Sequence, residues 1–122
     1  MRKKILIVDD SSTMVLMQRM VLTKNSFDVV TDGDGEEAIG VAVREKPDLI
    51  LMDVVMPKMN GFEACKRIRQ EESIRNTPVI MVTTRGEVVN VERGFESGCN
   101  DYVTKPINPV ELLTKVRACM AA

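Results

Sequence analysis

Short apolar runs alternate along the chain with longer segments that carry apolar residues on one helical face. The runs at 5–8, 49–52 and 79–82 contain no polar residue, which is typical of strands buried on both faces. Strands are therefore predicted at 4–8, 27–31, 48–52, 78–82 and 101–104. The intervening segments predict helices at about 12–25, 36–46, 62–72, 88–97 and 108–119.

The regular strand–helix alternation predicts an α/β fold. Five such units argue for one parallel sheet covered by helices on both faces. For five parallel strands the common open order is 2-1-3-4-5, the flavodoxin-like doubly wound arrangement. We expect a single domain over 1–122, with no segment left for a linker or a second domain. Ligands of such folds bind beyond the carboxyl ends of the strands, between strands one and three.

The first predicted helix carries an apolar stripe of Met14, Met17, Val21 and Met20. Apolar residues at helical spacing usually face the core, so we expect this stripe to pack inward. A flexible methionine surface for binding is the alternative.

Charged residues stand where three of the predicted strands end. Asp9 and Asp10 follow the first strand, Asp53 follows the third, and Lys105 follows the fifth. Parallel strands bring these side chains to one edge of the sheet. Two like charges 4 Å apart repel by about 4 kcal/mol at an effective dielectric of 20. A bound divalent cation relieves that repulsion, and oxygen-only ligands indicate a hard ion such as Mg²⁺.

This cluster can do specific chemistry, although each of its residues alone would be an ordinary solvated or capping residue. Asp10 and Asp53 can hold the ion directly, with Asp9 acting through a water. Lys105 is a point charge suited to a phosphoryl oxygen. Thr83, at the end of the fourth strand, offers a hydroxyl donor from the remaining side.

The amino-acid composition limits the classes of partner and the location expected for the chain. Seventeen basic and 18 acidic residues give a net charge of −1, which does not favour nucleic-acid binding. No apolar run approaches transmembrane length, so no membrane insertion is expected. Three cysteines without C-x-x-C spacing indicate reduced thiols and a cytoplasmic location. There is no histidine, so the chain cannot supply an imidazole.

Four segments resemble the receiver domain of two-component response regulators. They are Val8-Asp9-Asp10-Ser11, Asp53 with the segment 56–61, Val82-Thr83, and Tyr102-Val103-Thr104-Lys105-Pro106. The resemblance covers the whole chain in order. In size and layout the chain is similar to stand-alone regulators such as the chemotaxis response regulator.

The resemblance implies that Asp53 is the phosphoacceptor and that the phosphorus comes from a partner's phosphohistidine. The donor would be a sensor histidine kinase or a phosphotransfer protein. Asp10, Asp53 and the backbone carbonyl of Val55 would bind Mg²⁺, with Asp9 assisting. Such a chain is a signalling domain that promotes its own phosphotransfer and slow dephosphorylation, and it is not otherwise an enzyme.

The resemblance also implies how the signal leaves. Lys105 and Thr83 would contact the phosphoryl oxygens, and the Lys105–Pro106 peptide would be cis. The threonine would move inward, and Tyr102 would follow as the second switch residue. We expect a monomer whose target protein, in chemotaxis or another pathway, docks on the fourth helix, the fifth strand and the fifth helix.

Two positions predict slow hydrolysis of the phosphoryl group. Val55 and Arg85, two residues beyond Asp53 and Thr83, flank the expected path of the attacking water. Neither side chain activates water well, because valine is apolar and arginine stays protonated. Fast reset would then need a partner phosphatase.

Three other readings fit the sequence less well. A phosphatase of the aspartyl-phosphate type usually needs a second Asp where Val55 stands. A flavodoxin-like electron carrier would bring an anionic phosphate against Asp9 and Asp10, and the chain offers no Trp to sandwich a flavin. A degenerate receiver acting as a scaffold would lack charged positions that are all present here.

Overall fold

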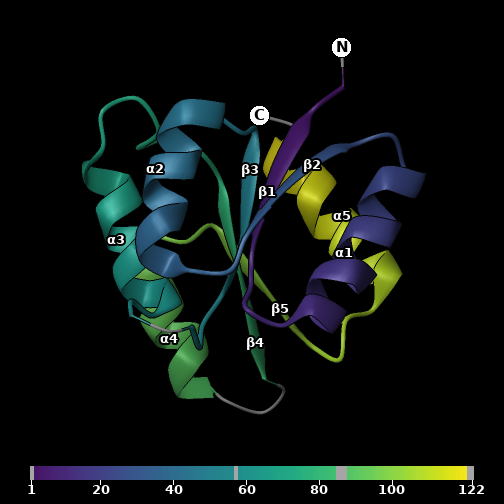
Figure 1. The fold of residues 1–122 in the computed structure, drawn as a ribbon. Coiled ribbons are helices and arrows are strands. Elements are labelled where there is room, and N and C mark those ends of the chain that lie inside the picture. Colours follow the sequence, from purple (N-terminus) through teal and green to yellow (C-terminus); the bar gives the residue numbers. More distant parts are fainter. Residues whose placement is uncertain (1, 57, 85–87, 121–122) are drawn as a thin grey trace.

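The computed structural model describes residues 2–56, 58–84 and 88–120, apart from the side chains of 84 and 88–91. These residues form five strands and five helices in strict alternation (Figure 1). In chain order they are β1 (Lys4–Val8), α1 (Ser12–Lys24), β2 (Asp28–Asp32), α2 (Gly35–Glu45), β3 (Leu49–Asp53), α3 (Gly61–Gln70), β4 (Val79–Thr84), α4 (Val88–Glu96), β5 (Asp101–Lys105) and α5 (Pro109–Met120). The predicted fold class is confirmed. No helix among the described residues is long and apolar enough to cross a bilayer.

The strands form one parallel sheet in the order β2-β1-β3-β4-β5, as predicted. The registers align the carboxyl ends of the central strands. Val8 pairs with Met52, and Asp53 pairs with Val82. At the other side Thr84 pairs with Lys105. Residues that follow these ends are therefore carried to one edge.

Two hydrophobic layers enclose the sheet. Helices α1 and α5 cover one face, and α2, α3 and α4 lie on the other (Figure 1). Alternate residues of β1 and β3 contribute to the two layers, and all apolar residues of these runs are fully buried. This burial explains why the runs show no polar alternation.

Side-chain caps explain where helices begin. Ser11 caps α1, Asp34 caps α2 and Asn60 caps α3, each accepting a hydrogen bond from a backbone N–H in the first turn. Because Asp34 and Asn60 are the caps, α2 and α3 begin one residue earlier than predicted. Phe27 lies outside β2, since its N–H donates to the Leu22 carbonyl at the end of α1.

The prediction for the methionine stripe is wrong in part. Met14 and Val21 pack against the core, but Met17 and Met20 are 41% and 61% exposed. The buried face of α1 runs through Gln18 and Leu22. Helix α1 is therefore rotated about its axis so that Met17 and Met20 face solvent.

Gly61 is required by a close backbone approach next to Asp53. A Cβ on residue 61 would lie 2.3 Å from the Asp53 carbonyl oxygen. Gly40, on the exposed side of α2, has nothing within 4 Å of the same added atom. Gly40 therefore serves as a control for the effect of an alanine substitution at Gly61.

We expect Gly61→Ala to lower the free energy of unfolding by about 1–3 kcal/mol, because backbone must move to admit the methyl group. Gly40→Ala should instead raise it by about 0.5–1 kcal/mol, since alanine is the better helix former. Urea denaturation of both variants measures the difference. Equal effects of the two substitutions would contradict the close approach.

Candidate functional site

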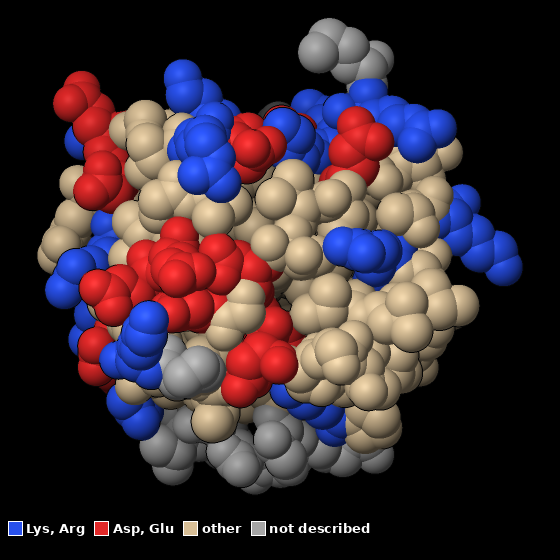
Figure 2. Space-filling view, viewed as in Figure 1, with Lys and Arg blue, Asp and Glu red and all other residues tan. Residues whose placement is uncertain are grey.

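The fold brings three carboxylates together at the carboxyl edge of the sheet. Asp9 and Asp10 follow β1, and Asp53 is the last residue of β3. One carboxylate oxygen of each lies within 4.8 Å of the others. Figure 2 shows acidic side chains gathered on one part of the surface, beside a mostly uncharged area on the side of α1 and α5.

The three carboxylates differ in exposure. Asp9 and Asp53 are buried, whereas Asp10 is exposed to solvent. The Oδ1 atom of Asp9 accepts a hydrogen bond of 2.9 Å from the Ser11 N–H at the start of α1. Its Oδ2 atom is buried and has no hydrogen-bond partner among the described residues. A buried oxygen of this kind normally has a partner, so Asp9 Oδ2 indicates a place for a cation or a bound water.

Lys105 joins the cluster from β5. Its Nζ donates a hydrogen bond of 3.0 Å to Asp53 Oδ1 and lies 3.7 Å from Asp9 Oδ2. The peptide bond between Lys105 and Pro106 is cis, as the resemblance implied. One ammonium thus stands against three carboxylates, which leaves the site with excess negative charge.

The surroundings raise the pKa of Asp53 above its usual value. Burial is the main cause, and the negative charges of Asp9 and Asp10 add to it. The hydrogen bond and charge of Lys105 oppose this rise and do not cancel it. Ionisation of Asp53 therefore carries a cost that a nearby cation would reduce.

Thr83 and Tyr102 lie on neighbouring strands. Thr83 is buried on β4, one residue past the Asp53–Val82 pairing. Met81 pairs with Tyr102, so Thr83 and Tyr102 are offset by two residues. Side chains two apart on a strand share a face, which puts Thr83 and Tyr102 diagonally adjacent on the same face of the sheet.

Val55 lies in the loop that follows β3. The Val55 side chain is 74% exposed, and the neighbouring Val54 carbonyl accepts a hydrogen bond of 2.9 Å from the Gly61 N–H. Arg85, the other residue expected beside the water path, lies outside the described residues.

One contact at the site was not predicted. Lys58, in the loop after β3, pairs with Asp34 at 3.2 Å and fastens this loop to the start of α2. Lys58 has a positive φ of 66°, in the left-handed region of backbone conformations. Nothing in the sequence identified the partner of Lys58.

The donor set fits Mg²⁺. The candidate ligands are carboxylate oxygens, without thiol or imidazole, as a hard cation prefers. Asp9 Oδ2, which accepts no hydrogen bond from the described residues, and the surplus of negative charge also favour a cation here. Asp9, Asp10 and Asp53 are the side chains that would hold the ion or its waters.

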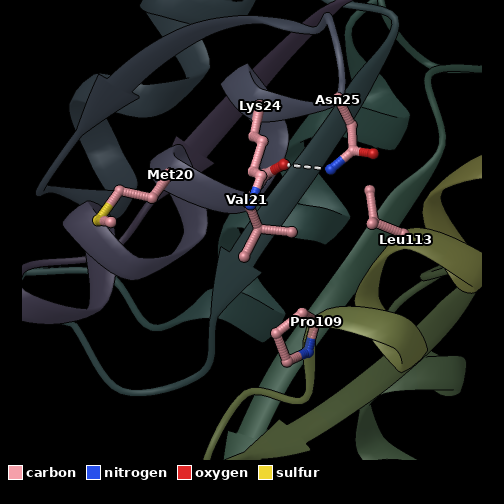
Figure 3. Close-up of a pocket in the computed structure, with 6 residues that line it drawn as sticks. All are labelled: Met20, Val21, Lys24, Asn25, Pro109 and Leu113. Carbon is pink, nitrogen blue, oxygen red and sulfur yellow. Dashed lines mark hydrogen bonds between the residues drawn. The ribbon is translucent and has the colours of Figure 1, made fainter.

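A separate groove lies between α1 and α5 (Figure 3). It is lined by Met20, Val21, Lys24, Asn25, Pro109 and Leu113. Its lining is apolar except for Lys24 and Asn25 and includes no carboxylate, thiol or hydroxyl. The groove therefore lacks the carboxylate oxygens that gather at the acidic edge.

Known proteins share both the sequence and the fold. The family model of the response regulator receiver domain matches residues 5–117. The transcriptional regulatory protein PhoP of alkaline phosphatase synthesis, from Bacillus subtilis, is 42% identical over 98% of this chain and 49% of its own length. The chain thus spans about half the length of the curated relatives it matches.

Two solved structures extend the comparison. The chemotaxis protein CheY4 of Vibrio cholerae has a TM-score of 0.91 at 34% identity, covering 98% of this chain and 99% of its own. The receiver domain of the sensor histidine kinase PA1611 from Pseudomonas aeruginosa has a TM-score of 0.93 at 29% identity, covering both chains fully. That structure has a magnesium ion coordinated in its active-site cleft.

The raised pKa of Asp53 predicts how stability depends on pH. The folded state binds the Asp53 proton more tightly than the unfolded state, whose pKa is about 3.9. Ionisation of Asp53 therefore lowers stability as pH rises from that value through the raised folded pKa. In metal-free buffer, Asp53→Asn should become progressively more stable relative to wild type over this window, by at most about 1.4 kcal/mol per pH unit.

Urea titrations at several pH values measure this difference. Asp28→Asn is the control, because Asp28 lies at the opposite end of the sheet and is exposed. A difference between Asp53→Asn and wild type that stayed constant from pH 4 to 8 would contradict the raised pKa.

Proposed function

The chain belongs to the response regulator receiver domain family of two-component systems, and on that premise we propose that it accepts a phosphoryl group on Asp53 from a partner's phosphohistidine. The donor is a sensor histidine kinase or a phosphotransfer protein. The observation that carries this proposal is the Lys105 Nζ only 3.0 Å from Asp53 Oδ1, inside a cluster of carboxylates with a surplus of negative charge.

The transfer is a nucleophilic displacement at phosphorus. A carboxylate oxygen of Asp53 forms a bond to phosphorus while the bond from phosphorus to the partner's imidazole nitrogen breaks. The electron pair of that bond returns to the imidazole, which takes up a proton from solvent. Burial disfavours the ionised carboxylate of Asp53, and its negative charge is consumed as the aspartyl phosphate forms.

The neighbouring residues have distinct roles in this step. Lys105 orients Asp53 before transfer, and its ammonium is placed to contact a phosphoryl oxygen afterwards. Asp10, Asp53 and the Val55 carbonyl would hold Mg²⁺, with Asp9 acting through a water. When bound, the ion supplies positive charge against the developing charge on the phosphoryl oxygens.

The phosphoryl group changes the balance of forces at the edge of the sheet. It brings a charge of about −2 and three acceptor oxygens. Moving a two-state element from 1:99 to 99:1 takes about 5.5 kcal/mol, and hydrogen bonds to charged groups contribute about 1.5–3 kcal/mol each. Contacts from Thr83 and Lys105 supply much of this difference, but only by moving or tightening when the phosphoryl group is added. The diagonal position of Tyr102 beside Thr83 supports Tyr102 as the residue that responds.

The target would read the surface of α4, β5 and α5, where Tyr102 lies. PhoP is described as a transcriptional regulatory protein, and CheY4 as a chemotaxis protein. The relatives therefore weaken the expectation of chemotaxis, which rested on size and layout. Our proposal covers the step that such regulators share, phosphoryl acceptance followed by a change of docking surface.

Incubation with acetyl phosphate tests the acceptor directly. We expect intact-mass spectrometry to show one phosphoryl adduct in the presence of Mg²⁺. No adduct should form after chelation with EDTA or in Asp53→Asn, because each removes one component of the site. Asp28→Asn should behave as wild type. An adduct of equal yield in Asp53→Asn would place the acceptor elsewhere.

Hydrolysis of the adduct should be slow. The Val55 side chain is exposed and apolar, so it cannot orient an attacking water. We expect the purified phosphoprotein to keep its adduct for minutes or longer, and Val55→Asn to shorten that time by supplying an amide. The decay of the adduct mass measures both rates. A half-life of seconds for wild type would count against this reading of Val55.

A further inference from the structure

The backbone of Tyr102 is capped by two side chains at the open edge of the sheet. Strand β5 is an edge strand and pairs only with β4. The Tyr102 N–H donates a hydrogen bond of 2.8 Å to Asp101 Oδ1. The Tyr102 carbonyl accepts a hydrogen bond from the Nζ of Lys115 on α5. Lys115 and Asp101 also form an ion pair at 3.7 Å, so together they cover both backbone groups.

The same ammonium lies over the aromatic ring. Lys115 Nζ is 4.4 Å from the centroid of the Tyr102 ring, within the range of a cation–π contact. Phe95 of α4 meets this ring edge to face at 6.1 Å. The ring is therefore held between α4 and α5, and Lys115 contacts it and its backbone at once.

This contact reaches from one layer of the molecule to the other. Tyr102 packs with the layer formed by α2 and α3, whereas α5 buries Leu112 and Val116 in the opposite layer. Lys115 extends around the open edge of β5 to bridge them. Its side chain is only 25% exposed, which limits competition from water.

We propose that Lys115 is a positioning residue that holds the Tyr102 ring in its unphosphorylated position. The proposal rests on the proposed function, in which Tyr102 moves when Asp53 is phosphorylated. The backbone hydrogen bond and the ion pair with Asp101 keep the ammonium in place. A ring that moves away loses this cation. Lys115 thus favours the unphosphorylated state, and its removal favours the phosphorylated one.

The chain supplies its own reporter for this contact. Tyr102 is the only tyrosine, and there is no tryptophan. Intrinsic tyrosine fluorescence therefore monitors the surroundings of Tyr102 alone. Beryllofluoride with Mg²⁺ serves as the probe of the phosphorylated state, because it binds an aspartate as a phosphoryl mimic.

Three variants separate the parts of the contact. Lys115→Met removes the charge and the hydrogen bond, Lys115→Gln keeps a donor without the charge, and Lys115→Arg keeps both. Lys66→Met is the matched control, since Lys66 is exposed on α3 in the other layer. All are compared with wild type by tyrosine emission and by beryllofluoride titration.

We expect the emission of unliganded Lys115→Met to shift toward that of wild type saturated with beryllofluoride. Its titration midpoint should fall by about two- to fivefold, the population change that a partly exposed cation–π contact supports. Lys115→Gln should shift in the same direction, while Lys115→Arg and Lys66→Met should match wild type. If Lys115→Met does not fold, Lys115→Gln decides the question.

Two results would overturn the proposal, and they are distinguishable. If wild type gains a phosphoryl adduct and responds to beryllofluoride, but both neutral variants match it in emission and midpoint, Lys115 does not hold the ring. If wild type gains no adduct from acetyl phosphate, the proposed function fails. The role of Lys115 in favouring the unphosphorylated state then fails with it.

Discussion

Repulsion among Asp9, Asp10 and Asp53 is the constraint around which this edge of the molecule is organised. The parallel registers carry these carboxylates to one place, and burial of Asp9 and Asp53 strengthens their interaction. Among the described side chains, Lys105 is the cation that forms ion pairs with this cluster. A single ammonium offsets part of the charge and leaves the remainder for ligands. The cluster is therefore electrostatically unfavourable by itself, and a bound cation would stabilise it.

Two contacts connect the backbone around the site to the rest of the protein. The carbonyl of Asp53 leaves no room for a Cβ on Gly61, so β3 and the start of α3 are in direct contact. The Lys58–Asp34 ion pair fastens the intervening loop from the other side. The loop that carries Val55 is therefore positioned by contacts within the protein. Because the loop is positioned in advance, ligand binding does not have to offset the free-energy cost of ordering it.

Most of the fold could be predicted from the sequence, because strands buried on both faces leave uninterrupted apolar runs and parallel strands have few possible orders. The proximity of Asp53 and Lys105 could be predicted as well, because each is the last residue of a strand in that parallel sheet. The exposure of Met17 and Met20 was missed because the rotation of α1 depends on its packing with α5. The partner of Lys115 was missed for a related reason: a side chain that reaches around a sheet edge leaves no periodic signal.

Strand β5 connects the acidic edge to the proposed docking surface through two lysine contacts. Lys105, at its carboxyl end, holds Asp53, and Lys115 holds Tyr102 three residues earlier. An edge strand with one neighbour has fewer contacts that resist movement than a central strand. A phosphoryl group on Asp53 would draw Lys105 toward new oxygens, while Lys115 resists the accompanying change at Tyr102. The response would then depend on the difference between these two contacts, so a change on α5 could tune it without altering Asp53.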